Sequence, residues 1–220
     1  MNEERGKGGR GMGKNRIEAL TDAIFAVAMT LLVLDIKPPG ELRFESSAAL
    51  IEHLATLRHS FVMYVISFFV LAIFWLGHHL QFHFVRHADR TLLWINLAFL
   101  LLAGVVPFCT DLVGDHEHLQ FPVLLYAANL LALSLLLLLQ LRHLVANPGL
   151  TDGELTGEAV AHLRRQVALF VLVPLASVAV SFYSPLLGMY LYVVLLVNAF
   201  VPGRIDKLTG AAAHDKKPEA

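Results

Sequence analysis

The stretch that decides the fold runs from residue 16 to residue 36 and reads RIEALTDAIFAVAMTLLVLDI. Its length suits a helix that crosses a bilayer, which needs about 20 residues. The stretch also contains Thr21, Asp22 and Thr30. A carboxylate in or near hydrocarbon is costly, so a membrane helix that keeps one usually turns it toward protein or water. The stretch therefore predicts a membrane-spanning helix that holds Asp22 away from lipid.

The chain as a whole is apolar and weakly charged. Of its 220 residues, 56% are hydrophobic and 16% are charged, whereas soluble domains average about 25% charged residues. This composition is typical of a polytopic membrane protein and gives no indication of nucleic-acid binding. The single cysteine, Cys109, excludes an intrachain disulfide and cannot by itself build a cysteine metal site.

Apolar runs along the chain predict an all-α membrane protein with six transmembrane helices. They are expected at residues 16–36, 59–84, 91–110, 119–145, 159–182 and 186–202. We interpret residues 16–205 as one transmembrane domain, with a short amphipathic turn at 48–57 in its first long loop. The basic, Gly-rich residues 1–15 and the residues 206–220 are expected to be disordered tails.

The distribution of lysine and arginine predicts the orientation in the membrane. Six spans place both termini on one side, and that side carries 14 of the 17 Lys and Arg residues, against 3 on the other. Cytoplasmic loops carry an excess of these residues. We therefore expect a multi-pass protein of the cell membrane with both termini in the cytoplasm.

A helical wheel divides the first helix into two faces. At about 100° per residue, one arc of about 100° collects an apolar stripe and one hydroxyl. These residues are Val27, Thr30, Leu31 and Leu34. Thr21 and Asp22 fall on the opposite face, where they would anchor the helix to its neighbours. The stripe by itself also fits an ordinary packing surface, because such stripes occur in most membrane helices.

The segment Arg16-x-x-x-Leu20-Thr21-Asp22-Ala23 resembles the signature of the transmembrane protein 175 family of potassium channels, which reads Arg-x-x-x-Phe-Ser-Asp-Gly. The departures keep apolar, hydroxyl and small character. The likeness continues through Phe74-Trp75-x-x-His78-His79, Trp94-Ile95-Asn96-Leu97 and Val106-Pro107-Phe108-x-Thr110. It covers about residues 14–205 and is similar to the single-repeat bacterial members of the family.

The resemblance implies a homotetramer in which four first helices surround a central potassium pore. The family's pore layers fall on Val27, Thr30, Leu31 and Leu34, the same residues that share one face of the wheel. A ring of apolar side chains gates by dewetting and selects through the cost of removing water from the ion. Valine at position 27 is smaller than the isoleucine or leucine usual in relatives, so we expect a wider ring and weaker selectivity for potassium.

A polar cluster is expected to hold the first helix against the second and third. Its candidate members are Arg16, Thr21, Asp22, His78 and Asn96. All would be costly if left unpaired in the membrane, and the family uses such a network to brace the pore helix. A direct role in gating or proton sensing is the alternative.

Two other functions remain open at this point. The rival to a channel is a proton-coupled secondary transporter that uses Asp22 and His78 as a relay, and a non-conducting scaffold is a third possibility. The common hydrolase and phosphate-loop motifs do not occur, so we expect no enzyme and no cofactor.

Two groups of histidines and acids invite a metal interpretation. His79, His83 and His87 are spaced four residues apart, but the second helix is expected to end near residue 84. The acidic turn expected at residues 111–118 contains Asp111, Asp115, Glu117, His116 and His118. We interpret this turn, together with Asp35, as a negative vestibule that concentrates cations, and we expect no metal site.

Overall fold

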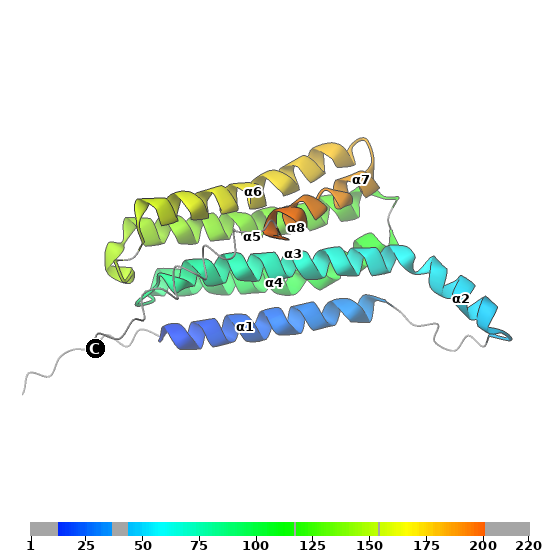
Figure 1. Ribbon diagram of the computed structural model, residues 1–220, viewed down its shortest axis with the longest axis horizontal. Coiled ribbons are helices and arrows are strands. Elements are labelled where there is room, and N and C mark those ends of the chain that lie inside the picture. Colours follow the sequence, from blue (N-terminus) through cyan, green and yellow to red (C-terminus); the bar gives the residue numbers. More distant parts are fainter. Residues whose placement is uncertain (1–12, 37–43, 117, 154, 201–220) are drawn as a thin grey trace, which may run out of the picture.

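The computed structural model describes residues 13–36, 44–116, 118–153 and 155–200, and these residues form a bundle of long antiparallel helices (Figure 1). Its elements are α1 (Lys14–Leu31), the 3₁₀ turn η1 (Leu32–Asp35), α2 (Ser47–Thr56), α3 (Arg58–His83), α4 (Arg90–Asp115), α5 (Gln120–Ala146), the 3₁₀ turn η2 (Pro148–Leu150), α6 (Gly157–Ser181), α7 (Pro185–Tyr190) and α8 (Val193–Phe200). Within these residues the only β pairing is a single bridge between Val85 and Thr151.

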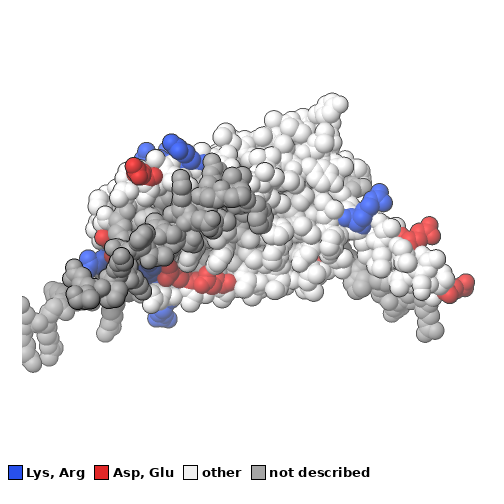
Figure 2. All heavy atoms as spheres, in the orientation of Figure 1, with Lys and Arg blue, Asp and Glu red and all other residues white. Residues whose placement is uncertain are grey.

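Five of the helices are long and apolar enough to cross a membrane. They are α3, α4, α5, α6 and α1 together with η1, and a sixth, shorter apolar element runs from Pro185 to Asn198. Figure 2 shows the charged atoms gathered toward the two ends of the bundle, with a long uncharged surface between them. The all-α, six-helix membrane fold expected from the sequence is therefore confirmed.

Polar caps determine where several helices begin. The side chains of Ser46, Asp89, Thr156 and Ser184 each accept a hydrogen bond from the backbone N–H three residues later. An N-cap of this kind satisfies a backbone donor that the first helical turn leaves unpaired. These caps start α2, α4, α6 and α7 close to the boundaries that the sequence predicts.

Three boundaries differ from the expectation. The first helix begins two residues earlier, at Lys14, and its last turn tightens into η1. The third expected helix continues to Asp115, so the acidic turn predicted at residues 111–118 is wrong for residues 111–115. Burial of Val113 in the bundle stabilises this helical extension. Of the tails expected at residues 1–15 and 206–220, Lys14 and Asn15 instead belong to α1, and residues 1–12 and 206–220 lie outside the described residues.

The sixth span is two short helices rather than one. Backbone bonds from Val194 to Leu191 and from Leu195 to Tyr192 tighten the chain between α7 and α8. The tightening seats Tyr192, which is fully buried, against the ring of Tyr126 on α5, with ring centroids 5.2 Å apart. Burial of this aromatic pair explains why the helix does not continue unbroken.

The helices form layers, with α1 at one edge and α6 at the other (Figure 1). Helix α1 packs on α3 and α4, α4 packs on α5, and α5 packs on α6. One buried apolar cluster, which includes Phe25, Phe74, Phe99 and Phe170, runs through these layers. This arrangement leaves one side of α1 without a covering helix.

Candidate functional site: the two faces of α1

One face of α1 is packed into the bundle. Residues Ile17, Thr21, Phe25, Ala28 and Leu32 are buried at helical spacing. The ring of Phe25 contacts Phe99 of α4, with centroids 5.6 Å apart. This face fixes the rotation of α1 about its own axis.

The other face is exposed in the single chain. The exposed fractions are 54% for Val27, 43% for Leu31 and 68% for Leu34, and Thr30 is exposed beside them. Only 28% of the membrane-spanning window of α1 is buried, compared with 50% for α4 and α5. The four residues named from the sequence as pore-lining thus lie together on a mostly apolar surface that the chain itself does not cover.

The hydroxyl of Thr30 has a defined role in its own helix. Its oxygen lies 3.0 Å from the carbonyl oxygen of Ala26 and 2.8 Å from that of Val27, so the hydroxyl hydrogen is donated to the backbone. The lone pairs of the oxygen then remain available. Thr30 is therefore the one group among the four candidates that can offer an oxygen to a cation.

Asn96 of α4 is the centre of the polar contacts beneath α1. Its side-chain oxygen lies 2.7 Å from Nε2 of His78 and 3.4 Å from the hydroxyl oxygen of Thr21. All three residues are buried. The structure thus brings together three of the five residues expected in the polar cluster, one from each of α1, α3 and α4.

Asp22 lies apart from this group. It is exposed, and its carboxylate accepts a hydrogen bond of 2.8 Å from the indole N–H of Trp75 on α3. Trp75 belongs to the motif quoted from the sequence, but its pairing with Asp22 was not predicted. The sequence did contain one signal for this pairing. Trp75 lies three residues before His78, which places both side chains on the same side of α3, the side expected to face α1.

Arg16 is not drawn into the polar cluster. Its side chain is exposed, and among the described residues it forms no hydrogen bond or ion pair. Arg16 lies eleven residues before Val27, which is close to three helical turns. The arginine therefore stands on the same exposed face as the pore candidates, toward the N-terminal end.

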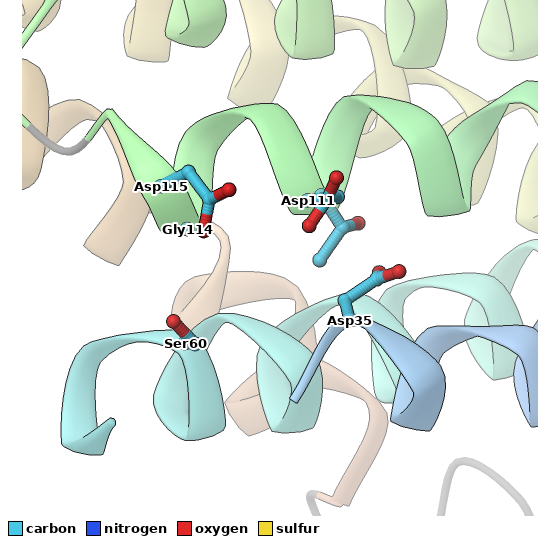
Figure 3. A pocket seen from close by; sticks show the side chains of 6 residues that line it. Asp35, Ser60, Asp111, Gly114 and Asp115 are labelled. Atoms are coloured by element: carbon cyan, nitrogen blue, oxygen red, sulfur yellow. The ribbon is translucent and has the colours of Figure 1, made fainter. Parts of the chain in front are cut away.

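Three carboxylates gather at the opposite end of α1. Asp35, Asp111 and Asp115 line a small pocket together with Ser60, Thr110 and Gly114, between the ends of η1 and α4 and the start of α3 (Figure 3). Glu117, also expected in this group, lies outside the described residues. The acidic residues thus converge as a group, although Asp111 and Asp115 are carried by a helix rather than by a turn.

The histidine series of α3 does not stay on one helix. Helix α3 ends at His83, so His87 lies in the following connection. In the part of the chain that the structure describes, no group of three or more His, Cys, Asp or Glu side chains is arranged to hold a metal ion.

Comparisons with known proteins agree on one family. The model of the family described as endosomal/lysosomal potassium channel TMEM175 matches residues 16–107. A protein of Streptomyces collinus named as a potassium channel is 31% identical over 175 residues, which are 77% of this chain and 82% of that one. A second, from Chryseobacterium, is 26% identical over 197 residues, or 89% and 97% of the two chains.

A solved structure shares the fold. The crystal structure of a lysosomal potassium-selective channel TMEM175 homolog from Chamaesiphon minutus superposes with a TM-score of 0.72 at 28% identity. The match covers 84% of this chain and 95% of that one. The likeness therefore extends over the helical bundle and beyond the residues that carry the sequence motifs.

Proposed function

The chain belongs to the TMEM175 family, and from this premise we propose that it is a potassium channel whose pore is lined by the exposed face of α1. The pore residues would be Val27, Thr30, Leu31 and Leu34. Relatives named as potassium channels support potassium as the conducted ion. They give no support to the transporter alternative with its Asp22 and His78 relay.

The observation that carries the proposal is the two-sided character of α1. One side is fixed to α3 and α4 by buried contacts, while the other presents a mostly apolar surface from Leu20 to Leu34. A single helix cannot enclose a path for ions. We therefore propose that four copies of the chain place their exposed α1 faces around one axis, as a homotetramer.

The chemistry of this face suits selection by dehydration. Rings built from Val27, Leu31 and Leu34 would offer no ligands to a bare ion, so an ion must shed water to pass. Potassium holds its hydration shell less tightly than sodium, so removing that water costs it less free energy. Between two of these rings, the Thr30 oxygens could replace part of the lost hydration.

The charges at the two ends fit this use. Asp35, Asp111 and Asp115 lie at the end of the bundle where η1 finishes, and a negative vestibule concentrates cations before they enter the pore. Lys14, Arg86 and Arg90 lie at the other end. Following the excess of positive charge, we propose that this second end and both termini are cytoplasmic.

The test is potassium flux into proteoliposomes that contain the full chain, with no gradient of any other ion. A channel conducts at once, and Leu34→Ala should raise the flux because a smaller ring is easier to wet. Leu172→Ala is the matched control, since Leu172 is 59% exposed on α6, at the far edge of the bundle.

Two results would contradict the proposal. Flux that appears only when a proton gradient is imposed would indicate a transporter. Equal effects of Leu34→Ala and Leu172→Ala would show that the exposed face of α1 does not line the ion path.

A further inference from the structure

Two exposed stripes run the length of α5 and α6. On α5 the stripe consists of Phe121, Ala128, Leu135, Leu139 and Arg142. On α6 it consists of Phe182, Leu175, Leu172, Ala168 and Arg165, with Arg164 beside its last member. Each stripe therefore begins with an aromatic ring at one end of the bundle, continues with aliphatic side chains and finishes with arginine at the other end.

The arginines of the two stripes lie at nearly the same depth. The hydroxyl of Ser134 on α5 donates to the carbonyl of Phe170 on α6 across 2.7 Å, which fixes the register of these antiparallel helices. Counting away from that contact places Arg164 and Arg165 about 3–5 Å deeper than Arg142, at about 1.5 Å per residue. Figure 2 shows positive atoms on the surface near the start of α6.

These arginines have no acidic partner in the described part of the chain. Lys14 pairs with Glu18, Arg86 with Asp152 and His143 with Asp89. Arg142, Arg164 and Arg165 are exposed and belong to none of these pairs. Three guanidinium groups at similar depths thus remain available for negative charge from outside the chain.

The position of the stripes indicates that they face lipid. Helix α6 is the layer farthest from α1 (Figure 1), so an assembly built around α1 places it at the outside. The exposed aliphatic side chains of both stripes fit a hydrocarbon environment, and arginines gather at the cytoplasmic end of membrane helices.

We propose that Arg142, Arg164 and Arg165 bind the phosphate headgroups of anionic phospholipids, whose acyl chains lie along the leucines of the two stripes. A guanidinium presents parallel N–H donors that match two phosphate oxygens. The aliphatic stem of arginine can lie along the acyl chains while its charged end reaches the headgroup. Lipid binding at this patch does not depend on which ion the pore conducts.

The experiment measures lipid binding directly. The purified full chain is titrated with phosphatidylglycerol and, separately, with phosphatidylcholine, and bound lipid is counted by native mass spectrometry. We expect phosphatidylglycerol to bind more tightly, with roughly a fivefold loss of affinity for each arginine changed to glutamine. Replacement by lysine should retain most of the affinity because the charge remains.

Arg58→Gln is the matched control, because Arg58 is an exposed arginine at the other end of the bundle. It should leave the binding unchanged. The single variant Arg165→Gln, with its thermal unfolding measured beside the wild type, separates a lost lipid from a damaged fold.

The proposal is overturned if the triple glutamine variant binds phosphatidylglycerol as the wild type does, or if Arg58→Gln causes the same loss. Equal affinity for phosphatidylcholine would also overturn it. A change in the number of associated chains, without a change in bound lipid, would show that the patch contacts a second copy instead.

Discussion

The indole nitrogen of Trp75 on α3 lies 2.8 Å from a carboxylate oxygen of Asp22 on α1, and the indole N–H donates to it. Asp22 is exposed at the side of the helix rather than buried beneath it. Its charge is thus held by the neighbouring helix, beside the exposed face that carries Val27 and Leu34. The contact fastens the N-terminal half of α1 at the point where its apolar run begins.

We predict that Trp75→Phe lowers the free energy of unfolding by about 1–2 kcal/mol, because the carboxylate loses a hydrogen bond to a charged group. Asp22→Asn should cost less, since the amide oxygen still accepts the bond. Chemical denaturation of the full chain in detergent measures both. Trp94→Phe is the control, because Trp94 is 61% exposed. An equal loss from Trp94→Phe would contradict the assignment.

Asn96 carries a second prediction. It is fully buried, and its oxygen accepts from His78 and lies near the Thr21 hydroxyl. Asn96→Leu leaves the imidazole N–H without this acceptor, so we expect a loss of about 1–3 kcal/mol in the free energy of unfolding. Thr21→Val should cost less, because the Thr21 hydroxyl also bonds to the carbonyl of Ile17 in its own helix. A larger effect at Thr21 than at Asn96 would show that the centre of the contacts lies elsewhere.

Close packing at Gly188 gives a third prediction. A Cβ atom added there would lie 2.9 Å from the carbonyl oxygen of Ser177 and 3.3 Å from Cβ of Ser181. The nearer neighbour is backbone and cannot rotate away, so Gly188→Ala should destabilise the chain by about 1–3 kcal/mol through overpacking. Gly104→Ala is the control, because nothing lies within 4 Å of a Cβ at Gly104. Thermal unfolding that is equal for the two variants would contradict the tight contact between α6 and α7.

Much of the fold could be predicted because the length and hydropathy of a membrane helix can be read directly from the sequence. The shared face of Val27, Thr30, Leu31 and Leu34 followed from helical periodicity, whereas its use as a pore surface came from the family resemblance; the structure leaves all four side chains exposed. What remains a prediction is their role, since one chain contains only one such helix.

The features that the sequence did not predict depend on contacts between distant segments. The break between α7 and α8 exists because Tyr192 is buried against Tyr126, and no local signal marks that pairing. The partner of Asp22 could not be chosen from the wheel, because the wheel gives a direction on α1 but not the neighbour that stands there. Val113 likewise extends α4 through packing rather than through its own helical preference.

The pH dependence of stability provides a fourth prediction, centred on Asp89. Burial acts to raise the pKa of this carboxyl, but hydrogen bonds from the Leu92 N–H and from His143, together with the attraction of His143, hold the pKa below its ordinary value of 3.8. A lowered pKa stabilises the folded chain above the ordinary value, and this contribution is lost as the pH falls through the lowered one.

Asp89→Asn should therefore reduce the free energy of unfolding at pH 7, and the difference from the wild type should shrink as the pH falls below 3.8. The amide keeps an oxygen that can cap α4, so the change isolates the charge. Denaturation at a series of pH values measures the difference. A difference that stays constant down to the lowest pH would show that the charge of Asp89 does not contribute.

The last prediction concerns the width of the ring at Val27. If four copies of this residue form the narrow layer, Val27→Ile adds one methylene to each side chain and narrows the opening, which raises the cost of passage for the more tightly hydrated ion. The potassium-to-sodium permeability ratio should then rise. A difference of about 0.7 kcal/mol between the two barriers corresponds to roughly a threefold change in the ratio.

Reversal potentials in planar bilayers under mixed potassium and sodium measure this ratio. Val33→Ile is the matched control, because Val33 is 47% exposed, compared with 54% for Val27, but lies on another side of the helix. The same methylene added at Val33 should leave the ratio unchanged, since that side does not belong to the proposed ring. If Val27→Ile also leaves the ratio unchanged, the narrow layer is not at Val27, and Leu31 and Leu34 become the candidates for selection.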